Sequence, residues 1–562
     1  MKSRVWLVGI AVAVAWTVPL RAQRQSPADT RKKVDAVFAD VNKPDSPGCA
    51  LGVMREGKLT YSRGYGLANL EHNIPITTRT VFDVGSVSKH LTAAAIVLLA
   101  QQGQLSLDDE VRKFVPELPD YGPKLTIRHL LHHTGGVRNY DTLMALAATD
   151  FSGRTGDREA LDIIVRQKEL NFPPGEDYLY SNSGYFLLSQ VVKKAGGKTL
   201  RDFARENIFE PLGMNDTQYY DDTTRIVPRR ATAYDPRRGG GFQIEMSNFE
   251  QTGDGAVFTT IEDLLRWDRN FDQPRVLGKQ GLEWMQTPGV LNSGKKLTYA
   301  FGLSVAAYKG LRVVEHGGSW AGYRAHFLRF PEQKLSVACL CNVGNAAPGR
   351  RARQVAEVYL GAQMTAEGKP AASSGDGNKP AAAALSPAER AKYLGVYRNA
   401  TVGGLRRVIE EKDALRARVS TQAFDLVPGG PGEFRWVTPG GEVRVRFEPR
   451  EGGGFRFVQF NAEGTSTSYD PVEPFAPTLE QLGELTGEFY SEEADVVYTL
   501  FVREGQPRLR IGRYREMALE PAFRDAFAFD MGQLLMARDA AGRITGFSVQ
   551  AGRVRNIRFR RM

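Results

Sequence analysis

Residues 82–99 read FDVGSVSKHLTAAAIVLL, and this stretch decides the fold. It holds Ser86 and Lys89 in a Ser-x-x-Lys spacing, and the chain then stays apolar nearly all round from Ala93 to Ala100. A helix without a polar face lies inside its domain. Residues at i and i+3 share one helix face with Cβ atoms about 5–6 Å apart, so the Lys89 amine can reach the Ser86 hydroxyl. The stretch therefore predicts a buried helix on which Lys89 could act as a base toward Ser86, although a Ser-x-x-Lys spacing alone is common and not specific.

Two further motifs follow in order along the chain. Tyr180-Ser-Asn182 stands before an apolar run, and His316-Gly-Gly318 ends one expected strand shortly before the next. Together with Ser86 and Lys89, these motifs resemble those of the serine β-lactamase and penicillin-binding superfamily. The resemblance is specific to its class C-like branch, which includes D-aminopeptidases, D-Ala-D-Ala carboxypeptidases and related esterases. Further matching text, within a resemblance that covers about Ala28 to Gly361, stands at Leu130–Gly136, Gly253–Asp263 and His316–Pro331.

The resemblance implies roles for individual residues. Ser86 would form an acyl-enzyme, and either Lys89 or Tyr180 would take its proton, the two titrating as a coupled unit. The implied oxyanion hole joins the backbone amide of Ser86 to that of Ser319. The implied catalytic residues are Ser86, Lys89 and Tyr180, and the implied substrate-binding residues are Asn182, His316, Gly318 and Ser319. No metal or other cofactor is implied.

One departure from the family pattern bears on the substrate. The third motif of β-lactamases and most carboxypeptidases begins with Lys, whose cation pairs with a substrate carboxylate, whereas this chain has His316. An imidazole is mostly neutral at pH 7. We therefore expect weaker demand for a free carboxylate at that end of the substrate, as in the D-aminopeptidases and esterases of the branch.

The predicted function is that of an exported serine hydrolase that forms an acyl-enzyme. Its expected substrate is a small peptide, amide or ester, with D-amino-acid peptides as candidates. Two alternatives stay open: β-lactamase or D-Ala-D-Ala carboxypeptidase activity, and a non-catalytic penicillin-binding or sensor role.

Upstream of residue 363, helical and strand patterns alternate. This predicts an α+β fold like that of β-lactamases and transpeptidases, with an antiparallel sheet closed by the two ends of the domain, flanking helices and an all-helical subdomain. The expected helices are Ala28–Val41, Ser88–Gln102, Arg158–Gln167, Ser183–Lys194, Leu200–Phe209 and Ile261–Asn270. The expected strands are Gly48–Met54, Leu59–Gly66, Tyr299–Ala307, Leu311–His316, Tyr323–Phe330 and Lys334–Asn342.

The C-terminal part of the chain has a different character. Residues 363–384 carry no aromatic or branched aliphatic side chain, which predicts a flexible linker. Beyond it, Ser386–Glu389 and Thr478–Gln481 match a helix capping box 92 residues apart, and short alternating strands follow each. We expect two small all-β, barrel-like domains at 385–474 and 475–562. They would cover the active-site mouth, contact the cell wall or join copies of the chain.

The first 22 residues are typical of a secretory signal peptide. Lys2 and Arg4 precede an apolar run from Val5 to Leu20, which is short for a membrane span of about 20 residues. We therefore expect a periplasmic or secreted protein with its catalytic domain at 23–362 and no transmembrane segment after cleavage. An uncleaved N-terminal anchor is the alternative, because Leu20 and Arg21 are imperfect residues near a cleavage site. Without Lys2, Arg4 and Arg21, 71 of the 74 basic residues remain against 64 acidic ones, a net charge of +7. This weak excess argues against a nucleic-acid partner.

Three cysteines are too few for a disulfide scaffold. Cys339 and Cys341 stand at i and i+2 of one expected strand and are badly placed to bridge each other. Three buried thiols are therefore expected, with one bridge from Cys49 as the alternative.

Several weaker patterns have an ordinary structural interpretation. The arginines between Arg553 and Arg561 are predicted to lie on a solvated strand edge. His129, His132 and His133 have a spacing that can hold a metal, but no acidic residue within the motif completes a site. Loops of the C-terminal domains could supply an acidic group for a substrate ammonium, and the weak candidates are Glu492, Glu493 and Asp495.

Overall fold

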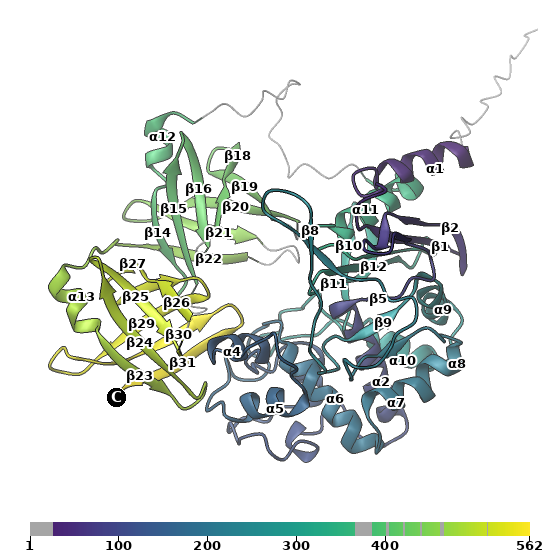
Figure 1. The fold of residues 1–562 in the computed structure, drawn as a ribbon, viewed down its shortest axis with the longest axis horizontal. Coiled ribbons are helices and arrows are strands. Elements are labelled where there is room, and N and C mark those ends of the chain that lie inside the picture. Colours follow the sequence, from purple (N-terminus) through teal and green to yellow (C-terminus); the bar gives the residue numbers. More distant parts are fainter. Residues whose placement is uncertain are drawn as a thin grey trace, which may run out of the picture.

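The computed structural model describes residues 26–365, 385–400, 404–419, 422–438, 441–460, 466–513 and 515–562. The predicted signal peptide and most of the predicted linker lie outside the described residues. A mixed helix and sheet region is followed by two larger β-sheets (Figure 1). This arrangement confirms the predicted α+β fold with two C-terminal β units. No helix in the described ranges has both the length and the apolarity needed to cross a membrane.

A six-stranded antiparallel sheet frames the first region, in the order β10-β11-β12-β13-β1-β2. The two ends of the domain meet in this sheet, because β1 pairs with β13 from Cys49↔Cys341 to Arg55↔Leu335. The sequence had predicted this closure. The strands are β1 (Cys49–Arg55), β2 (Lys58–Tyr65), β10 (Ser304–Tyr308), β11 (Leu311–Trp320), β12 (Tyr323–Phe330) and β13 (Leu335–Cys341).

Alternate side chains of this sheet face two separate cores. On β13, Ala338 and Leu340 join the core that contains helices α2 and α9, whereas Val337 and Cys339 join the core beneath α1 and α11. The sequence did not predict α11, because its three arginines hide the apolar face that covers the sheet. The helices on the two faces are α1 (Pro27–Ala36), α9 (Ile261–Asp272) and α11 (Pro348–Leu360).

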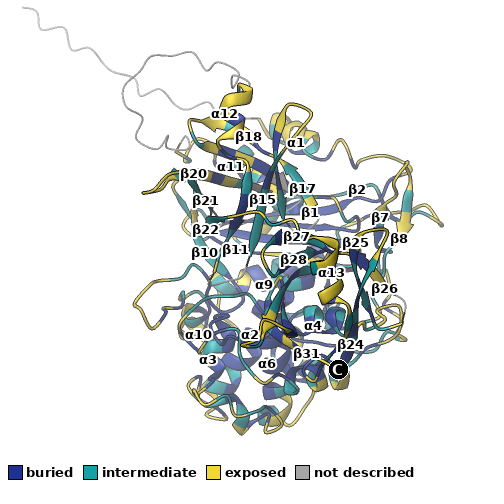
Figure 2. Cartoon of the chain, turned by 90° about the vertical axis from the view of Figure 1, so that its left-hand side faces the viewer, coloured by how far each residue is buried: buried dark blue, intermediate teal, exposed yellow. Residues whose placement is uncertain are grey.

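The helical region surrounds α2 (Lys89–Gln101), which is buried along nearly its whole length, as its composition predicted. Around α2 and α6 most residues are buried (Figure 2). The predicted helix Leu200–Phe209 begins as α7 and continues as the π-helical turn Arg205–Phe209. The other helices here are α3 (Ile127–Leu131), α4 (Tyr140–Leu146), α5 (Asp157–Val165), α6 (Asn182–Gly196), α7 (Leu200–Ala204), α8 (Glu210–Leu212) and α10 (Gly278–Met285).

Small sheets complete the region around α2. The sheet β5-β9-β6 carries the chain into the nucleophile's turn, and short pairs form at β3-β4 and β7-β8. Their strands are β3 (Leu67–Asn69), β4 (Ile74–Pro75), β5 (Phe82–Asp83), β6 (Gln218–Tyr219), β7 (Tyr234–Pro236), β8 (Phe242–Ile244) and β9 (Val257–Thr259).

Two nine-stranded antiparallel sheets follow and share one strand order. The first runs β17-β16-β15-β14-β22-β21-β20-β19-β18, and the second runs β26-β25-β24-β23-β31-β30-β29-β28-β27. Each follows a short capped helix, α12 (Pro387–Ala391) or α13 (Leu479–Leu485), and both predicted capping boxes are formed. Each sheet is nearly closed into a barrel (Figure 1). The predicted internal repeat is therefore confirmed.

The strands of the first barrel are β14 (Gly395–Arg398), β15 (Leu405–Glu411), β16 (Ala414–Val419), β17 (Gln422–Asp425), β18 (Val427–Gly430), β19 (Glu433–Thr438), β20 (Gly441–Pro449), β21 (Phe455–Phe460) and β22 (Ser466–Val472). Those of the second are β23 (Gly487–Ser491), β24 (Val496–Arg503), β25 (Gln506–Ile511), β26 (Arg515–Ala518), β27 (Glu520–Phe523), β28 (Ala526–Phe529), β29 (Gly532–Arg538), β30 (Ile544–Ala551) and β31 (Val554–Arg561).

The second barrel is anchored on the helical region beside α4 and α5 (Figure 1). Arg138 Nη1 lies 2.5 Å from Glu493 Oε1, with side-chain exposures of 1% and 6%. Removing one partner of such a pair leaves a buried charge, at a cost of about 3–5 kcal/mol. Tyr498 also donates a hydrogen bond to the Leu146 carbonyl at 2.9 Å. These contacts fix the barrel's position relative to the helices.

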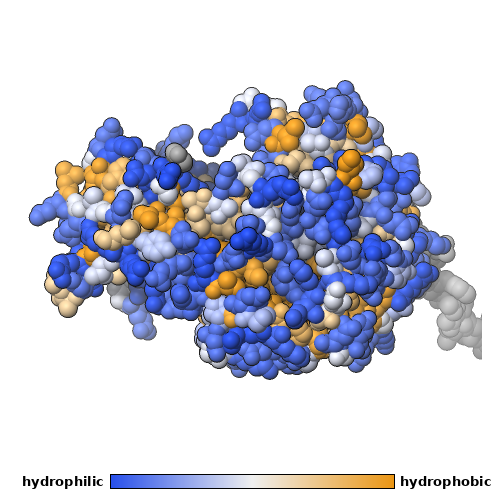
Figure 3. Space-filling view, turned by 60° about the horizontal axis from the view of Figure 1, so that its bottom comes forward, coloured by the Kyte–Doolittle hydropathy of each residue, from blue (hydrophilic) through white to orange (hydrophobic). Residues whose placement is uncertain are grey.

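Two sequence expectations about this barrel are wrong. Glu493 is held by Arg138, and Glu492 and Asp495 pair with arginines outside the active-site cleft, so none of the three is available to a substrate ammonium there. The arginine-rich strand β31 lies between β23 and β30 and is not an edge. The exposed face in Figure 3 is mostly hydrophilic, and its hydrophobic side chains form small separate groups.

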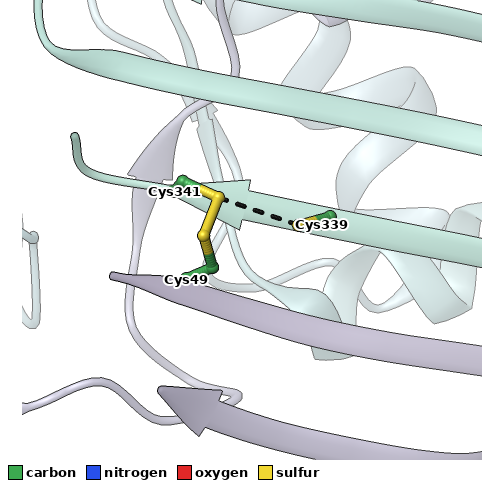
Figure 4. Close-up of side chains that lie close together, drawn as sticks. All are labelled: Cys49, Cys339 and Cys341. Carbon is green, nitrogen blue, oxygen red and sulfur yellow. Dashed lines mark hydrogen bonds between the residues drawn. A yellow bond between two sulfur atoms is a disulfide. The ribbon is translucent and has the colours of Figure 1, made fainter. Parts of the chain in front are cut away.

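Cys49 and Cys341 face each other on β1 and β13 and form a disulfide (Figure 4). The expectation of three buried thiols is wrong for this pair, because the sequence does not show that these strands are neighbours. Cys339 is buried and free, with its sulfur 3.7 Å from that of Cys341. Burial raises the pKa of the Cys339 thiol to about 12, so the thiol stays protonated at neutral pH.

Candidate active site

A cleft of about 1810 Å³ brings the predicted site residues together. Its walls come from the central sheet and the helical region, with Val443 of the first barrel and Arg553 at the tip of the second. The predicted site residues that line it are Ser86, Tyr180, Asn182, His316, Gly318 and Ser319. The cleft therefore unites three motifs that lie far apart in the chain.

Ser86 lies on the cleft wall in the 3-10 turn η1 (Gly85–Ser88), which joins β5 to α2. It is half-buried, while the other residues of the turn are buried. Gly85 has a φ of 50° and packs so closely on β11 that a Cβ there would lie 2.8 Å from the Ser319 nitrogen. Only glycine suits both the conformation and the contact.

Gly318 makes the matching close approach from β11. A Cβ at Gly318 would lie 1.9 Å from the Val84 carbonyl oxygen and 3.3 Å from the Ser86 nitrogen. The two glycines therefore press the third-motif strand directly against the nucleophile's turn. The amides of Ser86 and Ser319, the predicted oxyanion donors, lie on the two backbones that this contact joins.

Lys89 begins α2 and is fully buried. Its Nζ donates to Ser86 Oγ at 3.1 Å, Asn182 Oδ1 at 2.9 Å and the Asp254 carbonyl at 2.5 Å. Three acceptors match the three N–H groups of an ammonium. The helical spacing that predicted the Ser86–Lys89 contact is therefore realised, and the other two partners come from distant segments.

Asn182 connects Lys89 to a carboxylate. Its side-chain Nδ2 donates to Asp141 Oδ2 at 2.9 Å, while its Oδ1 accepts from Lys89. The Asn182 backbone amide donates to Asn139 Oδ1 at 2.7 Å. Both the oxygen and the nitrogen of the Asn182 side chain therefore already have partners in the absence of substrate. The predicted contact of this side chain with a substrate amide must share or replace one of these two bonds.

Tyr180 lies at the centre of a group of rings and cations. Its hydroxyl is buried and has no hydrogen-bond partner among the described residues. Lys89 Nζ lies 4.9 Å from the centroid of its ring, Arg553 Cζ lies 4.6 Å away, and the His133 ring lies 4.1 Å away. The hydroxyl is therefore free to bond an incoming group.

His316 is held as a neutral ring. Its Nε2 lies 3.0 Å from the Tyr299 hydroxyl, and its Nδ1 lies 2.6 Å from the Gly317 carbonyl, which can only accept. We therefore assign the proton to Nδ1. Burial, with a smaller effect from the Lys89 cation, lowers the pKa of His316 to about 3. The position that holds a lysine in β-lactamases thus carries no charge here, in line with the sequence-based expectation.

Two buried carboxyl groups stand in the cleft wall and were not predicted. Asp254 is 7% exposed, accepts from the Tyr140 hydroxyl at 3.2 Å through Oδ2, and has no partner for Oδ1 among the described residues. Burial raises the pKa of Asp254 to about 6 and that of Asp83 to about 7. Asp254 stood inside the motif text Gly253–Asp263, but nothing in its spacing pointed to the nucleophile.

The three histidines that had a metal-like spacing make separate contacts. His129 Nδ1 accepts from the Thr126 amide, His132 Nδ1 lies 3.2 Å from the Tyr299 carbonyl, and His133 Nδ1 accepts from the Ser181 amide. His129 caps α3, whereas His132 and His133 bond segments next to Tyr180. Burial lowers the pKa of His133 well below its usual value.

A family model described as "Beta-lactamase" matches residues 34–360. The chain belongs to the beta-lactamase family. This match covers the cleft residues except Val443 of the first barrel and Arg553 of the second. Together with the D-aminopeptidase relatives, the beta-lactamase family match identifies the chain as a serine hydrolase.

Curated relatives extend the similarity of this beta-lactamase-family chain beyond the catalytic domain. A D-aminopeptidase of Gluconobacter oxydans (strain 621H) is 30% identical over 301 residues, which are 54% of this chain and 57% of that protein's length. A D-aminopeptidase of Brucella anthropi is 25% identical over 536 residues, covering 92% of this chain and 95% of the relative. Penicillin-binding protein 4* of Bacillus subtilis (strain 168) is 27% identical over 452 residues, covering 76% and 96%.

Solved structures support the fold. The octameric penicillin-binding protein homologue from Pyrococcus abyssi aligns with a TM-score of 0.55 at 21% identity, over 87% of this chain and 99% of that one. The D-amino acid amidase from Ochrobactrum anthropi SV3 aligns with a TM-score of 0.50 at 22% identity, over 60% and 100%. The similarity to the first of these reaches past the catalytic domain into the C-terminal barrels.

Proposed function

We propose that this chain is an exported serine hydrolase that removes an N-terminal D-amino acid from short peptides or amides through an acyl-enzyme. The observation that carries the proposal is the 3.1 Å contact between Lys89 Nζ and Ser86 Oγ, in a cleft that also holds the unpartnered carboxylate oxygen of Asp254. The D-aminopeptidase relatives support the D-peptide substrate class.

Acylation would begin with attack of Ser86 Oγ on the substrate carbonyl carbon. The hydroxyl proton passes to the Lys89–Tyr180 pair, and the carbonyl oxygen takes up the negative charge between the amides of Ser86 and Ser319. The C–N bond then breaks as the Tyr180 hydroxyl, free of other partners, delivers a proton to the leaving amine.

Deacylation reverses these roles with water in place of the amine. Water attacks the ester carbonyl, its proton passes to the same pair, and Ser86 leaves as the restored hydroxyl. The products are the free amino acid and the shortened peptide, and no cofactor is consumed.

A free α-ammonium on the substrate suits the acyl side of the cleft. Asp254 Oδ1 and Gln251 Nε2 are buried cleft atoms without partners among the described residues, and Asp141 lines the same wall. Buried polar atoms are nearly always paired, so such atoms indicate a place that a ligand or water fills. An ammonium would pair with the Asp254 carboxylate and satisfy Oδ1.

The function is tested by comparing three chromogenic substrates on the mature enzyme. We expect kcat/KM for D-alanine p-nitroanilide to exceed that for the L isomer and for the N-acetyl-D isomer at least about tenfold, which corresponds to about 1.4 kcal/mol. Equal rates for the D and L isomers would remove the D-peptide assignment, and faster cleavage of the acetylated compound would remove the aminopeptidase assignment.

Asp254→Asn tests the ammonium contact. We expect kcat/KM for D-alanine p-nitroanilide to fall about 10–100-fold, since a hydrogen bond to a charged group contributes about 1.5–3 kcal/mol. The N-acetyl compound, measured in parallel, should change less than about threefold. Asp45→Asn, at an exposed position away from the cleft, is the matched control. An equal loss on both substrates would mean that Asp254 acts on the catalytic groups instead.

The pH dependence gives a second measurement of the same contact. The pKa of Asp254 is raised to about 6, so its carboxylate is charged above that pH and protonated below it. The wild-type ratio of kcat/KM for the free-amine substrate to that for the acetylated one should therefore fall as the pH drops through about 6. Changes in Ser86, Lys89 and Tyr180 act on both substrates and cancel in the ratio. A flat ratio between pH 5 and 8, or one that rises on acidification, would contradict the contact.

Export is supported by the charged and apolar pattern of residues 1–22 and by the Cys49–Cys341 disulfide. Disulfides persist mainly in oxidising compartments outside the cytoplasm. Intact mass of the protein purified from its native host checks this, and a mass that retains residues 1–22 would argue against cleavage.

A further inference from the structure

The second barrel sends one hairpin tip into the active-site cleft. The turn between β30 and β31 carries Arg553, and two hydrogen bonds to Asn171 of the catalytic domain hold it: Asn171 Nδ2 donates to the Arg553 carbonyl at 2.9 Å, and the Arg555 amide donates to Asn171 Oδ1 at 2.8 Å. Arg138 Nη2 adds a bond to the Asn556 carbonyl at 3.1 Å. The position of the tip is therefore built into the interface between the two domains.

Arg553 directly precedes β31 and differs in its charge partners from three arginines of that strand. Arg555, Arg558 and Arg560 each have a carboxylate partner within 3.3 Å: Asp177, Glu169 and Glu492. No carboxylate in the described part of the chain lies within ion-pair distance of Arg553. Its guanidinium stacks 4.6 Å from the centroid of the Tyr180 ring and lines the cleft with Ser86 and Asn182.

The charged groups of the cleft that lie near Ser86 and Tyr180 have different partners. The carboxyl groups of Asp83, Asp141 and Asp254 line the cleft on the side that the proposed function assigns to the acyl part of a substrate, and Lys89 is already bonded to three acceptors. Arg553 lies beside Tyr180, the residue that would protonate the leaving group, and His316 is neutral. Arg230, Arg324, Arg350 and Arg353 also line the cleft, but among the described arginines it is Arg553 that contacts the Tyr180 ring. Arg553 is therefore placed to bind an anion on the leaving-group side.

We propose that Arg553 binds the carboxylate of the leaving group, so that the substrates are free dipeptides or very short peptides whose C-terminal carboxylate lies one residue beyond the scissile bond. This rests on the proposed function. A guanidinium binds a carboxylate through two parallel N–H···O bonds, and the aromatic face beneath it holds the fork in place. The barrel thereby supplies the cation that the third motif lacks.

The test uses equilibrium binding, so that it does not depend on turnover. Three proteins are titrated calorimetrically: Ser86→Ala alone, Ser86→Ala with Arg553→Gln, and Ser86→Ala with Arg553→Lys. The ligands are D-Ala-D-Ala and its C-terminal amide. We expect the dipeptide to bind at least about tenfold more tightly than the amide. Arg553→Gln should remove that preference while leaving the affinity for the amide within about threefold, and Arg553→Lys should retain part of it.

Arg560→Gln, at an exposed position of the same strand, is the matched control and should not change either affinity. Equal affinities for dipeptide and amide, no binding of either, or a preference that survives Arg553→Gln would each overturn the carboxylate site. An equal loss for both ligands in Arg553→Gln and Arg553→Lys, with unchanged melting temperature, would also overturn it, because Arg553 would then act through Tyr180. Arg553-dependent binding together with absent wild-type turnover would sustain the site and reject the proposed function.

Discussion

Ser86→Ala is expected to abolish acylation and to lower kcat by at least about 10⁴-fold, because no other hydroxyl of the described chain contacts the Lys89 amine. The measurement is intact mass after incubation with p-nitrophenyl acetate or a fluorophosphonate. The wild type should gain the mass of one acyl or phosphonyl group, and the variant should gain none. Oxyanion stabilisation and substrate binding would account for any residual turnover.

Two measurements distinguish a loss of the nucleophile from a loss of folding: the melting temperature of Ser86→Ala and the acylation of a control variant. Ser86 is half-buried and its hydroxyl accepts one bond from Lys89, so its removal leaves the packing of η1 intact. The melting temperature of Ser86→Ala should therefore stay close to that of the wild type. Ser62→Ala, at an exposed position on β2, should acylate normally. The same mass gain on Ser86→Ala as on the wild type would remove the acyl-enzyme mechanism at this residue.

The second large effect is expected at Lys89. Lys89→Met keeps the length and the apolar stem of the side chain but loses the amine that bonds Ser86, Asn182 and Asp254. A positioned base contributes about 10²–10⁴-fold, and the variant also loses the cation beside Tyr180. We expect the rate of acylation by p-nitrophenyl acetate to fall about 10³-fold or more, measured as the rate of the pre-steady-state burst of p-nitrophenol with substrate in excess.

Tyr180→Phe separates the two candidate bases. If Lys89 alone takes the Ser86 proton, Tyr180→Phe should slow amide cleavage, which needs a protonated leaving amine, much more than cleavage of an activated ester. If Tyr180 is the base, both reactions should slow as much as in Lys89→Met. Lys194→Met, at an exposed position on α6, is the control for the loss of a lysine. A near-wild-type burst in Lys89→Met would contradict a role for its amine in acylation.

Much of the catalytic domain could be predicted because its signals are local. The i, i+3 spacing of Ser86 and Lys89 lies within one turn of helix, and the apolar run that follows could only be a buried helix. The strand Tyr323–Phe330 was predicted with both of its ends. Helix α11 was not predicted, because its apolar face is narrow and gives only a weak local signal. The apolar residues on that face are explained by their packing against the sheet, which the sequence does not show.

The candidate site was predictable only for residues that sit in a recurring motif. Asp254 contacts Lys89 across 165 residues of sequence, and no local period marks it. The error about β31 has the same origin, because alternating arginines look the same on an exposed edge and on a strand whose tip enters a cleft. Whether Arg553 meets solvent or Tyr180 depends on how the second barrel docks through Arg138 and Glu493.

The sequence by itself determined which chemistry is available: a hydroxyl one helical turn from an amine, an imidazole in place of a lysine in the third motif, and two copies of a capped β unit. These properties depend on residue type and short-range periodicity. The tertiary structure alone decided the disulfide between Cys49 and Cys341, which are 292 residues apart, the placement of the Asp254 and Asp141 carboxyl groups near Lys89 and its partner Asn182, and the approach of Arg553 to Tyr180. Contacts of this kind depend on which apolar faces bury one another when the sheet closes and the barrel docks, and that choice is made by the whole chain.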